Sequence, residues 1–390
     1  MSRIVFFNIP AYGHTNPTIE VVKELVRRGN VVRYYSFNSF REKIESAGAE
    51  FVSCDTYLPP LPADFEQRCG YDFAGLIEMI ADVTINMGQT VLDEMRIFNP
   101  DCIVFDSLCI WGKLFAQKLH IRAVCSTTTF AFNKQTSQMM KPSGKEAFYL
   151  ISGIPKISKK IRQLEQEGYC VTSITKFLEN DDKTSTIVYT SRSFQPQNEQ
   201  FGENYSFVGP LIDKSKICSK QVSLRPLIYI SLGTVMKRPT FYSECLEALR
   251  YCKCDVIMSV GSQKTMDTLK NIPSHIQVEI SVPQLTVLQN ADIFITHCGM
   301  NSVHESIYLG VPMILFPQQS EQQIVANRLS EMGMGILLKE LSQKAIQESI
   351  KYVWDNKKSM QEKLKKLATT FKIAGGAKRA ADVFENSVLR

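Results

Sequence analysis

The fold is decided by Ile293-Phe294-Ile295-Thr296-His297-Cys298-Gly299-Met300-Asn301-Ser302-Val303-His304-Glu305. The first four residues are apolar or β-branched, which is typical of a buried strand, and a helix is predicted to begin near Met300 and to stop at Gly310. A helix that begins directly after a strand presents unpaired N–H groups and a positive dipole end. The stretch therefore predicts a strand–turn–helix unit that favours an anion, with an ordinary helix cap as the alternative.

The side chains of this stretch suit a phosphorylated sugar. His297 and Ser302 add hydrogen-bond donors at the helix start. Asn301 and Glu305 are four residues apart, so they share one face of the predicted helix. A carboxylate one turn beyond the phosphate donors can accept hydrogen bonds from ribose hydroxyls. The pattern thus indicates a diphosphate and a ribose.

Two neighbouring turns extend the predicted site. The strand at 227–231 ends in Ser231-Leu232-Gly233-Thr234, where glycine lets the backbone approach a ligand and two hydroxyls suit phosphate oxygens. After a strand at 312–316 comes Pro317-Gln318-Gln319-Ser320-Glu321-Gln322, whose acid and amide can hydrogen-bond a polyol. Taken alone, the first is an ordinary turn and the second a solvated helix start.

Strands and helices alternate in both halves of the chain, which predicts parallel sheets with right-handed crossovers. Strands are expected at 3–9, 31–36, 50–54, 101–105, 123–126, 186–190, 206–208, 227–231, 255–259, 276–279, 292–296 and 312–316. The predicted organisation is an N-terminal domain over 1–210, a linker over 211–226, a C-terminal domain over 227–372 and a last helix over 373–390, which could pack back on the N-terminal domain. A cleft between the two domains is the expected binding site.

Composition narrows the functional classes. The chain has 390 residues, 44% of them apolar and 22% charged, and a net charge of +6, which is too mild for a nucleic-acid-binding surface. No signal-peptide pattern precedes the first strand, and no stretch approaches the roughly 18 apolar residues of a membrane span. The eleven cysteines are scattered, and Cys252 and Cys254 lack the partners of a zinc site. We expect a cytoplasmic protein without a metal site, whose cysteines are reduced and serve mainly in packing. The sequence does not indicate an oligomeric state.

These motifs resemble the donor signature of the UDP-glycosyltransferase superfamily, which has the GT-B fold, and the closest subgroup is the bacterial macrolide-type enzymes. The resemblance covers nearly the whole chain and is carried by Gly13-His14 with Asn16-Pro17, Phe207-Val208-Gly209-Pro210, Ser231–Thr234, Val282-Pro283-Gln284, His297–Glu305 and Pro317–Gln322. It implies an α/β protein of two doubly wound Rossmann-like domains that face each other across a cleft.

The resemblance also implies roles for residues in the second half. His297, Asn301, Ser302 and Thr234 would hold the diphosphate, Glu305 the ribose, the Gln284 backbone the uracil edge, and Glu321 with Gln322 the sugar hydroxyls. Ser231, Gly233, Val282 and Gly299 complete the donor set. One position departs from the family, since Ser281 stands where an aromatic residue usually stacks on uracil. Stacking of this kind is worth about 1–3 kcal/mol, so looser nucleotide recognition is expected.

Catalysis is assigned by the resemblance to the first half. His14 follows the first predicted strand, and Asp106 comes at the end of the strand predicted at 101–105. Both can therefore face one site in an open α/β sheet. Taken alone, they are a loop histidine and a helix cap. By the resemblance, His14 is the general base and Asp106 the acid that orients it.

The implied reaction is an inverting transfer of a hexose, glucose being expected, from a UDP-sugar to a hydroxyl of a small apolar or aromatic acceptor, without metal or cofactor. Candidate acceptor contacts are the loop Pro59–Tyr71 and Phe65, Phe73, Met79, Met87, Phe130, Phe132, Met139 and Met140. Ordinary core packing is the alternative for most of them, so none is assigned to the site. Two alternatives stay open: a non-catalytic nucleotide-sugar-binding protein, and a sugar-nucleotide epimerase of GT-B architecture.

Overall fold

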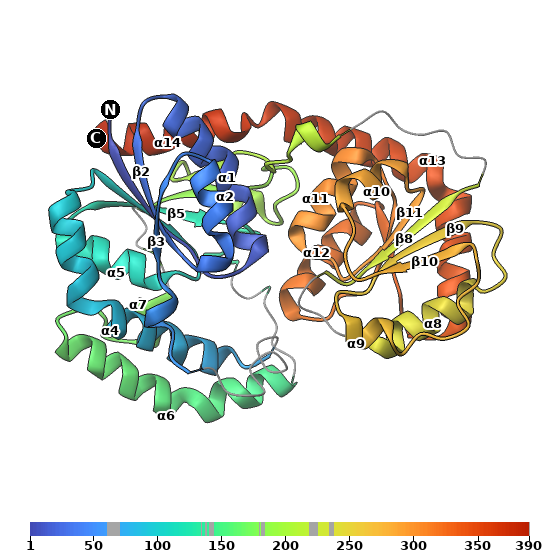
Figure 1. Cartoon of the computed structure of the whole chain (residues 1–390), viewed down its shortest axis with the longest axis horizontal. Helices are drawn as coiled ribbons and strands as arrows, with labels where there is room; N and C mark the ends of the chain where they lie inside the picture. The colour runs from blue at the N-terminus through green and yellow to red at the C-terminus, as the bar shows by residue number, and fades with distance from the viewer. Residues whose placement is uncertain are drawn as a thin grey trace. The chain divides into compact units, whose positions relative to one another are not determined.

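The computed structural model describes residues 1–60, 71–133, 135–136, 139, 144–178, 180, 184–217, 225–233 and 238–389. The chain divides into two compact units, Met1–Leu211 with Lys372–Arg390, and Ile212–Phe371. Each unit is a parallel sheet covered by helices on both faces (Figure 1). Thr234, Phe65 and Met140 lie outside the described residues.

The first unit has a seven-stranded sheet in the order β3-β2-β1-β4-β5-β6-β7, and all its strands are parallel. Its strands are β1 (Arg3–Phe7), β2 (Val31–Ser36), β3 (Glu50–Ser53), β4 (Cys102–Asp106), β5 (Arg122–Thr127), β6 (Ser185–Val188) and β7 (Tyr205–Phe207). Its α-helices are α1 (Tyr12–Arg27), α2 (Arg41–Ser46), α4 (Phe73–Phe98), α5 (Ile110–Leu119), α6 (Gly144–Gln166), α7 (Ile174–Leu178) and α14 (Gly376–Leu389). The chain moves from β1 outward to β3 and then returns to the other side of β1, so the strand order reverses between β1 and β4.

The second unit repeats this plan with six parallel strands in the order β10-β9-β8-β11-β12-β13. Its strands are β8 (Leu227–Ser231), β9 (Asp255–Ser259), β10 (Ile276–Glu279), β11 (Ile293–Thr296), β12 (Met313–Leu315) and β13 (Gly335–Leu337). Its helices are α8 (Pro239–Leu249), α9 (Gln263–Met266), α10 (Gln284–Asn290), α11 (Met300–Leu309), α12 (Ser320–Glu331) and most of α13 (Gln343–Ile373). Here the order reverses between β8 and β11.

Central strands are buried on both faces, which is why they appear in the sequence as unbroken apolar runs. Every residue of β4 is buried, as are Ile4–Phe7 of β1. Neighbouring strands also stack aromatic rings, with Phe7 and Tyr35 4.8 Å apart and Tyr229 and Phe294 4.9 Å apart. In the described part of the chain, no helix combines the length and apolarity of a membrane span.

Most predicted strand bounds differ from the structure by one or two residues, and three differences concern the site or the sheet order. The Asn16-Pro17 pair predicts a helix start at that point, but helix α1 begins at Tyr12, because the Ala11 carbonyl already accepts from the N–H groups of His14 and Thr15. Pro17 therefore lies inside the helix. His14 is therefore helical and not in a loop. Strand β1 ends at Phe7, two residues early. The short edge strand β13 was missed, since three residues beginning with glycine give no clear strand pattern.

The C-terminal helix α14 completes the first unit. Ala380, Ala381 and Phe384 are fully buried, and the ring of Phe384 meets that of Phe6 edge-on at 5.6 Å. These contacts place the last residues of the chain over the strands that contain the first ones. The core of this unit therefore depends on both ends of the sequence.

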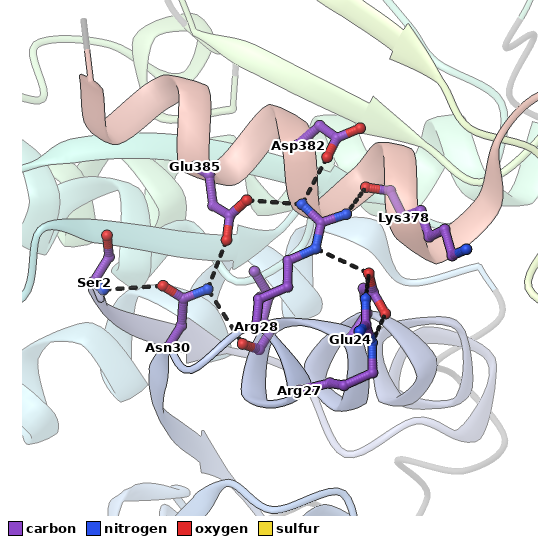
Figure 2. Close-up of polar contacts among 9 residues, drawn as sticks. Ser2, Glu24, Arg27, Arg28, Asn30, Lys378, Asp382 and Glu385 are labelled. Carbon is purple, nitrogen blue, oxygen red and sulfur yellow. Dashed lines mark hydrogen bonds and ion pairs between the residues drawn. The ribbon is translucent and has the colours of Figure 1, made fainter.

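Arg28, just after α1, holds α14 in place (Figure 2). Its guanidinium donates to Asp382 Oδ1 at 2.6 Å, to Glu385 Oε2 at 2.7 Å and to the Lys378 carbonyl at 3.0 Å. It also donates to Glu24 Oε1 at 2.9 Å, which ties it back to its own helix. The carboxylates of Asp382, Glu24 and Glu385 together raise the pKa of Arg28, so the cation is permanent.

The ion pairs around Glu24 predict a pH-dependent stability. Hydrogen bonds from Arg27 and, to a lesser extent, Arg28 lower the pKa of Glu24 from 4.5 to about 2. A carboxylate with a lowered pKa contributes stability above the unfolded pKa and loses it as the pH falls through the folded pKa. Glu24→Gln should therefore cost about 1–2 kcal/mol of unfolding free energy at pH 7, and the deficit should shrink between pH 4.5 and 2.

Urea unfolding of both proteins across this pH range measures the deficit. Glu20→Gln is the matched control, because Glu20 pairs with Lys23 on the same helix with its side chain 36% exposed. A deficit for Glu24→Gln that does not change with pH would contradict the prediction.

Candidate functional site

His14 and Asp106 meet at the carboxyl ends of two adjacent strands. His14 lies in the first turn of α1, directly after β1, and Asp106 is the last residue of β4, which pairs with β1. The distance from His14 Nδ1 to Asp106 Oδ2 is 2.7 Å, and the side chains are 16% and 1% exposed. The other oxygen, Asp106 Oδ1, accepts from the Leu108 N–H at 2.9 Å. The carboxylate is thus fixed at one end and engages the imidazole with the other.

Buried polar side chains, none of them predicted from the sequence, hold the turn that contains His14. Asn8 Nδ2 donates to the His14 carbonyl at 3.1 Å and to the Tyr34 hydroxyl at 2.8 Å. The Tyr34 hydroxyl lies 2.7 Å from Thr18 Oγ1, and Thr128 Oγ1 lies 3.3 Å from His14 Nδ1. A polar residue at the end of an apolar strand, as Asn8 is, was the signal available in the sequence.

In the second unit, the turns after β8 and β11 lie side by side, because Ser231 and Thr296 are register partners. Gly233 has a φ of +74°, and a Cβ there would lie 2.8 Å from His297 Cε1. Gly299 has an ordinary φ, but a Cβ there would lie 2.6 Å from His297 Nε2. Both glycines are therefore needed to leave room for the His297 ring.

His297 is a neutral imidazole at physiological pH. Burial lowers the pKa of His297 to about 4. A hydrogen bond with the Ser231 backbone acts in the opposite direction and is the smaller of the two effects. A neutral ring carries one N–H group and can donate one hydrogen bond without bringing a charge. It is suited to contact an anion and not to act as a cation.

Helix α11 begins at Met300 and is followed by Gly310, as the sequence predicted. Its N-cap, Gly299, has no side chain to satisfy the first N–H groups, and the preceding Cys298 adopts a left-handed φ of +68°. Asn301 and Ser302 lie half-buried in the first turn. This arrangement leaves the positive end of the helix dipole to a ligand.

Gln284 links the predicted phosphate and ribose residues through its side chain. Its Nε2 donates to Glu305 Oε2 at 2.7 Å and to Ser302 Oγ at 3.1 Å, while its Oε1 accepts from the Tyr229 hydroxyl at 3.3 Å. Burial raises the pKa of Glu305, and the bond from Gln284 opposes this. The family resemblance implies a role only for the Gln284 backbone, so this side-chain role is additional. Val282 lies half-buried just before α10.

Glutamine side chains within the segment after β12 form hydrogen bonds to its backbone. Gln322 is buried, and its Oε1 accepts from the Gln318 N–H at 2.9 Å, which fixes the turn before α12. Glu321 stands half-buried in the first turn of that helix. Within the described ranges, no three His, Cys, Asp or Glu side chains are grouped as a metal site would require.

Tyr242 on α8 was not singled out by the sequence, yet it supports the Ser231–Gly233 turn. Its hydroxyl accepts from the Leu232 N–H at 3.0 Å and donates to the Ser259 carbonyl at 2.8 Å. The phenol thus joins the ends of β8 and β9. A tyrosine in an apolar helix pattern gives no sign of this role in sequence.

Comparison with known proteins identifies the family. Residues 243–372 match the family described as erythromycin biosynthesis protein CIII-like, C-terminal domain. The chain is 34% identical over 401 residues to NDP-glycosyltransferase YjiC of Bacillus subtilis, covering 98% of this chain and 96% of that protein. It is 31% identical to the uncharacterized UDP-glucosyltransferase YojK of the same organism, with the same coverage.

The chain is a glycosyltransferase of the EryCIII-like family. The glycotransferase of kitacinnamycin has the same fold, with a TM-score of 0.84 at 22% identity, covering 99% of this chain and 98% of that one. The predicted GT-B architecture of two Rossmann-like domains is thereby confirmed. Membership of an EryCIII-like glycosyltransferase family also decides for a transferase over the binding protein and the epimerase.

The crowding at His297 yields a prediction for this glycosyltransferase. Gly299→Ala places a methyl group against His297 Nε2 and should displace the ring, while its ordinary φ lets the backbone stay as it is. By the family resemblance His297 donates to the diphosphate, and on that expectation loss of this one hydrogen bond should weaken UDP binding about 10-fold. Isothermal titration with UDP measures this.

Gly144→Ala is the matched control, since nothing lies within 4 Å of a Cβ at that position. UDP binding equal to wild type in Gly299→Ala would show that the His297 ring has no part in binding UDP.

Proposed function

We propose that this glycosyltransferase moves glucose from UDP-glucose to a hydroxyl of a small, largely apolar or aromatic acceptor, with inversion at the anomeric carbon. The observation that carries the proposal is the 2.7 Å hydrogen bond between His14 Nδ1 and Asp106 Oδ2. The donor assignment is supported by similarity to YojK, whose name is that of a UDP-glucosyltransferase. The free cysteines of the described chain suit the reducing cytoplasm, where we place the reaction.

His14 acts as the general base. The Asp106 carboxylate accepts the Nδ1–H hydrogen bond, which sets the tautomer and directs Nε2 to the acceptor hydroxyl. As the hydroxyl attacks the anomeric carbon, its proton passes to Nε2 and the C–O bond to UDP breaks. Asp106 then stabilises the imidazolium. Proton transfer of this kind contributes about 10²–10⁴-fold to the rate.

The second unit stabilises the leaving diphosphate. The N-terminus of α11 supplies N–H groups and a positive dipole end, and the neutral His297 supplies one more donor. We assign Asn301, Ser302, Ser231, Gly233 and Thr234 to the same diphosphate. Glu305, held by Gln284, is assigned to the ribose, and Glu321 with Gln322 to the sugar. We propose that these donors carry the developing charge without a metal ion or cofactor.

Exposed apolar side chains in the first unit support an apolar acceptor. Phe148 and Ile151 on α6 are each 68% exposed, Ile154 is 44% exposed, and Phe73 at the start of α4 is 42% exposed. The three α6 residues recur every third position and so share one face of the helix. Of the earlier candidates, Met87 and Phe130 are core residues, at 0% and 1% exposed.

The mechanism predicts a large rate loss without the base. His14→Ala should lower kcat by about 10²–10⁴-fold, and Asp106→Asn by about 10²-fold or more, because each leaves the acceptor proton without a properly oriented base. UDP-glucose is supplied with a panel of flavonoids, macrolides and phenols, and glycosylated products are detected by mass. UDP affinity should stay near wild type in both variants, and full transfer by His14→Ala would overturn the mechanism.

Ser281 predicts weak discrimination between nucleotide bases. Ser281 is exposed and offers no ring for uracil to stack on. Ser281→Trp should tighten binding of UDP by about 1–3 kcal/mol through stacking. Titration of the wild type and the Ser281→Trp variant with UDP and TDP measures the affinity for each nucleotide and the ratio of the two affinities. If the tryptophan variant gains nothing for either nucleotide, the base is recognised elsewhere.

A further inference from the structure

Two thiols in the second unit face each other away from the proposed donor residues. Cys252 and Cys254 precede β9, at its amino end, whereas the residues assigned to the donor follow the carboxyl ends of the strands. The Cys254 thiol donates to Cys252 Sγ at a sulfur–sulfur distance of 2.7 Å. The Cys252 thiol is also 3.5 Å from the Cys254 carbonyl. The glycosyl-transfer mechanism makes no use of this pair.

The two thiols differ in access. Cys254 is only 7% exposed, whereas Cys252 is half-buried and lines a shallow surface groove of about 350 Å³. Tyr251 and Trp354 line the same groove, and Lys351 adds a positive charge beside it. A small molecule can therefore reach Cys252, while Cys254 is accessible mainly through its neighbour.

The local electrostatics make Cys252 the nucleophile of the pair. The hydrogen bond from Cys254 lowers the pKa of Cys252 to about 6, and His275 acts weakly in the same direction. The pKa of Cys254 is raised by its role as donor and by burial. Burial is the largest cause of the raised pKa of other thiols in the described chain, such as Cys102 and Cys245, and the nearby Asp101 and Glu244 act in the same direction. A thiolate forms most readily at Cys252.

We propose that Cys252 and Cys254 are a redox dithiol that closes to an intramolecular disulfide when a small-molecule disulfide is the oxidant. The Cys252 thiolate attacks one sulfur of that disulfide, forms a mixed disulfide and releases one small thiol. Cys254 then loses its proton and attacks Cys252 Sγ, releasing the second small thiol. The pair loses two electrons and two protons, and the small disulfide becomes two thiols.

Proximity is the structural reason for the second step. The sulfurs are already in contact, so closure requires only that Cys254 replaces its hydrogen bond by a covalent bond. The same nearness keeps the mixed disulfide short-lived. In a reducing compartment such a disulfide is transient, which makes it a reversible modification and not a structural bridge.

Oxidation of the full-length protein by oxidised glutathione tests the proposal. Remaining thiols are then blocked with N-ethylmaleimide under denaturing conditions, and the protein is cleaved after glutamate. Cleavage after Glu247 and Glu279 gives residues 248–279, which contain only these two cysteines. In wild type this peptide should lose two hydrogens, carry no label and recover both labels after reduction. In Cys254→Ser it should instead retain one glutathione on Cys252.

Three controls make the test decisive. In Cys252→Ser, Cys254 should remain a thiol that is labelled only after denaturation. Cys170→Ser, which removes an exposed thiol elsewhere, should oxidise at 252–254 like wild type. Closure in the folded chain should be about 3-fold or more faster than in guanidinium, because the fold lowers the pKa and holds the sulfurs together.

Retention of two labels by the oxidised wild-type peptide would overturn the proposal, and so would equal rates in folded and unfolded protein. Thermal melting of each serine variant under reducing conditions, followed by circular dichroism, shows that it is folded.

Discussion

The reversal of strand order in each sheet is the constraint on which the proposed chemistry depends. Crossovers that leave a parallel sheet in opposite directions separate the loops that follow the two central strands, and this opens a place for a ligand. His14 and Asp106 follow β1 and end β4 at the reversal of the first sheet. At the reversal of the second sheet, Ser231 ends β8 and His297 follows β11. Each of these four residues lies at the end of a buried strand or shortly after it, so its position is set by the core.

Buried hydrogen bonds then convert position into orientation. Asn8 and Tyr34 fix the backbone of His14, Tyr242 fixes the turn at Gly233, and Gln284 fixes Glu305. An unsatisfied polar group in such surroundings costs about 1–3 kcal/mol, so these networks tolerate few alternative arrangements. The cost of orienting each group is thereby met during folding and not during the reaction.

The sequence was sufficient for most of the fold because central parallel strands are continuous apolar runs, as in Ile4–Phe7 and Ile293–Ile295. It failed where the signal is not local. The contacts of Arg28 with α14 join residues more than 350 positions apart, and no periodicity reveals them. Strand β13 is defined by its neighbour β12 more than by its own residues. Likewise, family motifs point to His14, Asp106 and Glu305, whereas Tyr242 and the Gln284 side chain emerge only from packing.

His14 and His297 have different surroundings, which favour different roles for the same side chain. The residue type alone does not distinguish these roles. His14 Nδ1 lies 2.7 Å from the carboxylate of Asp106, whose side chain is 1% exposed. His297 is crowded by two glycines, and burial lowers its pKa to about 4, so protonation is disfavoured there. A general base must accept a proton as the reaction proceeds, whereas a donor to a diphosphate must keep the one it has. The carboxylate beside His14 and the burial of His297 fit the opposite roles that we propose for these two histidines.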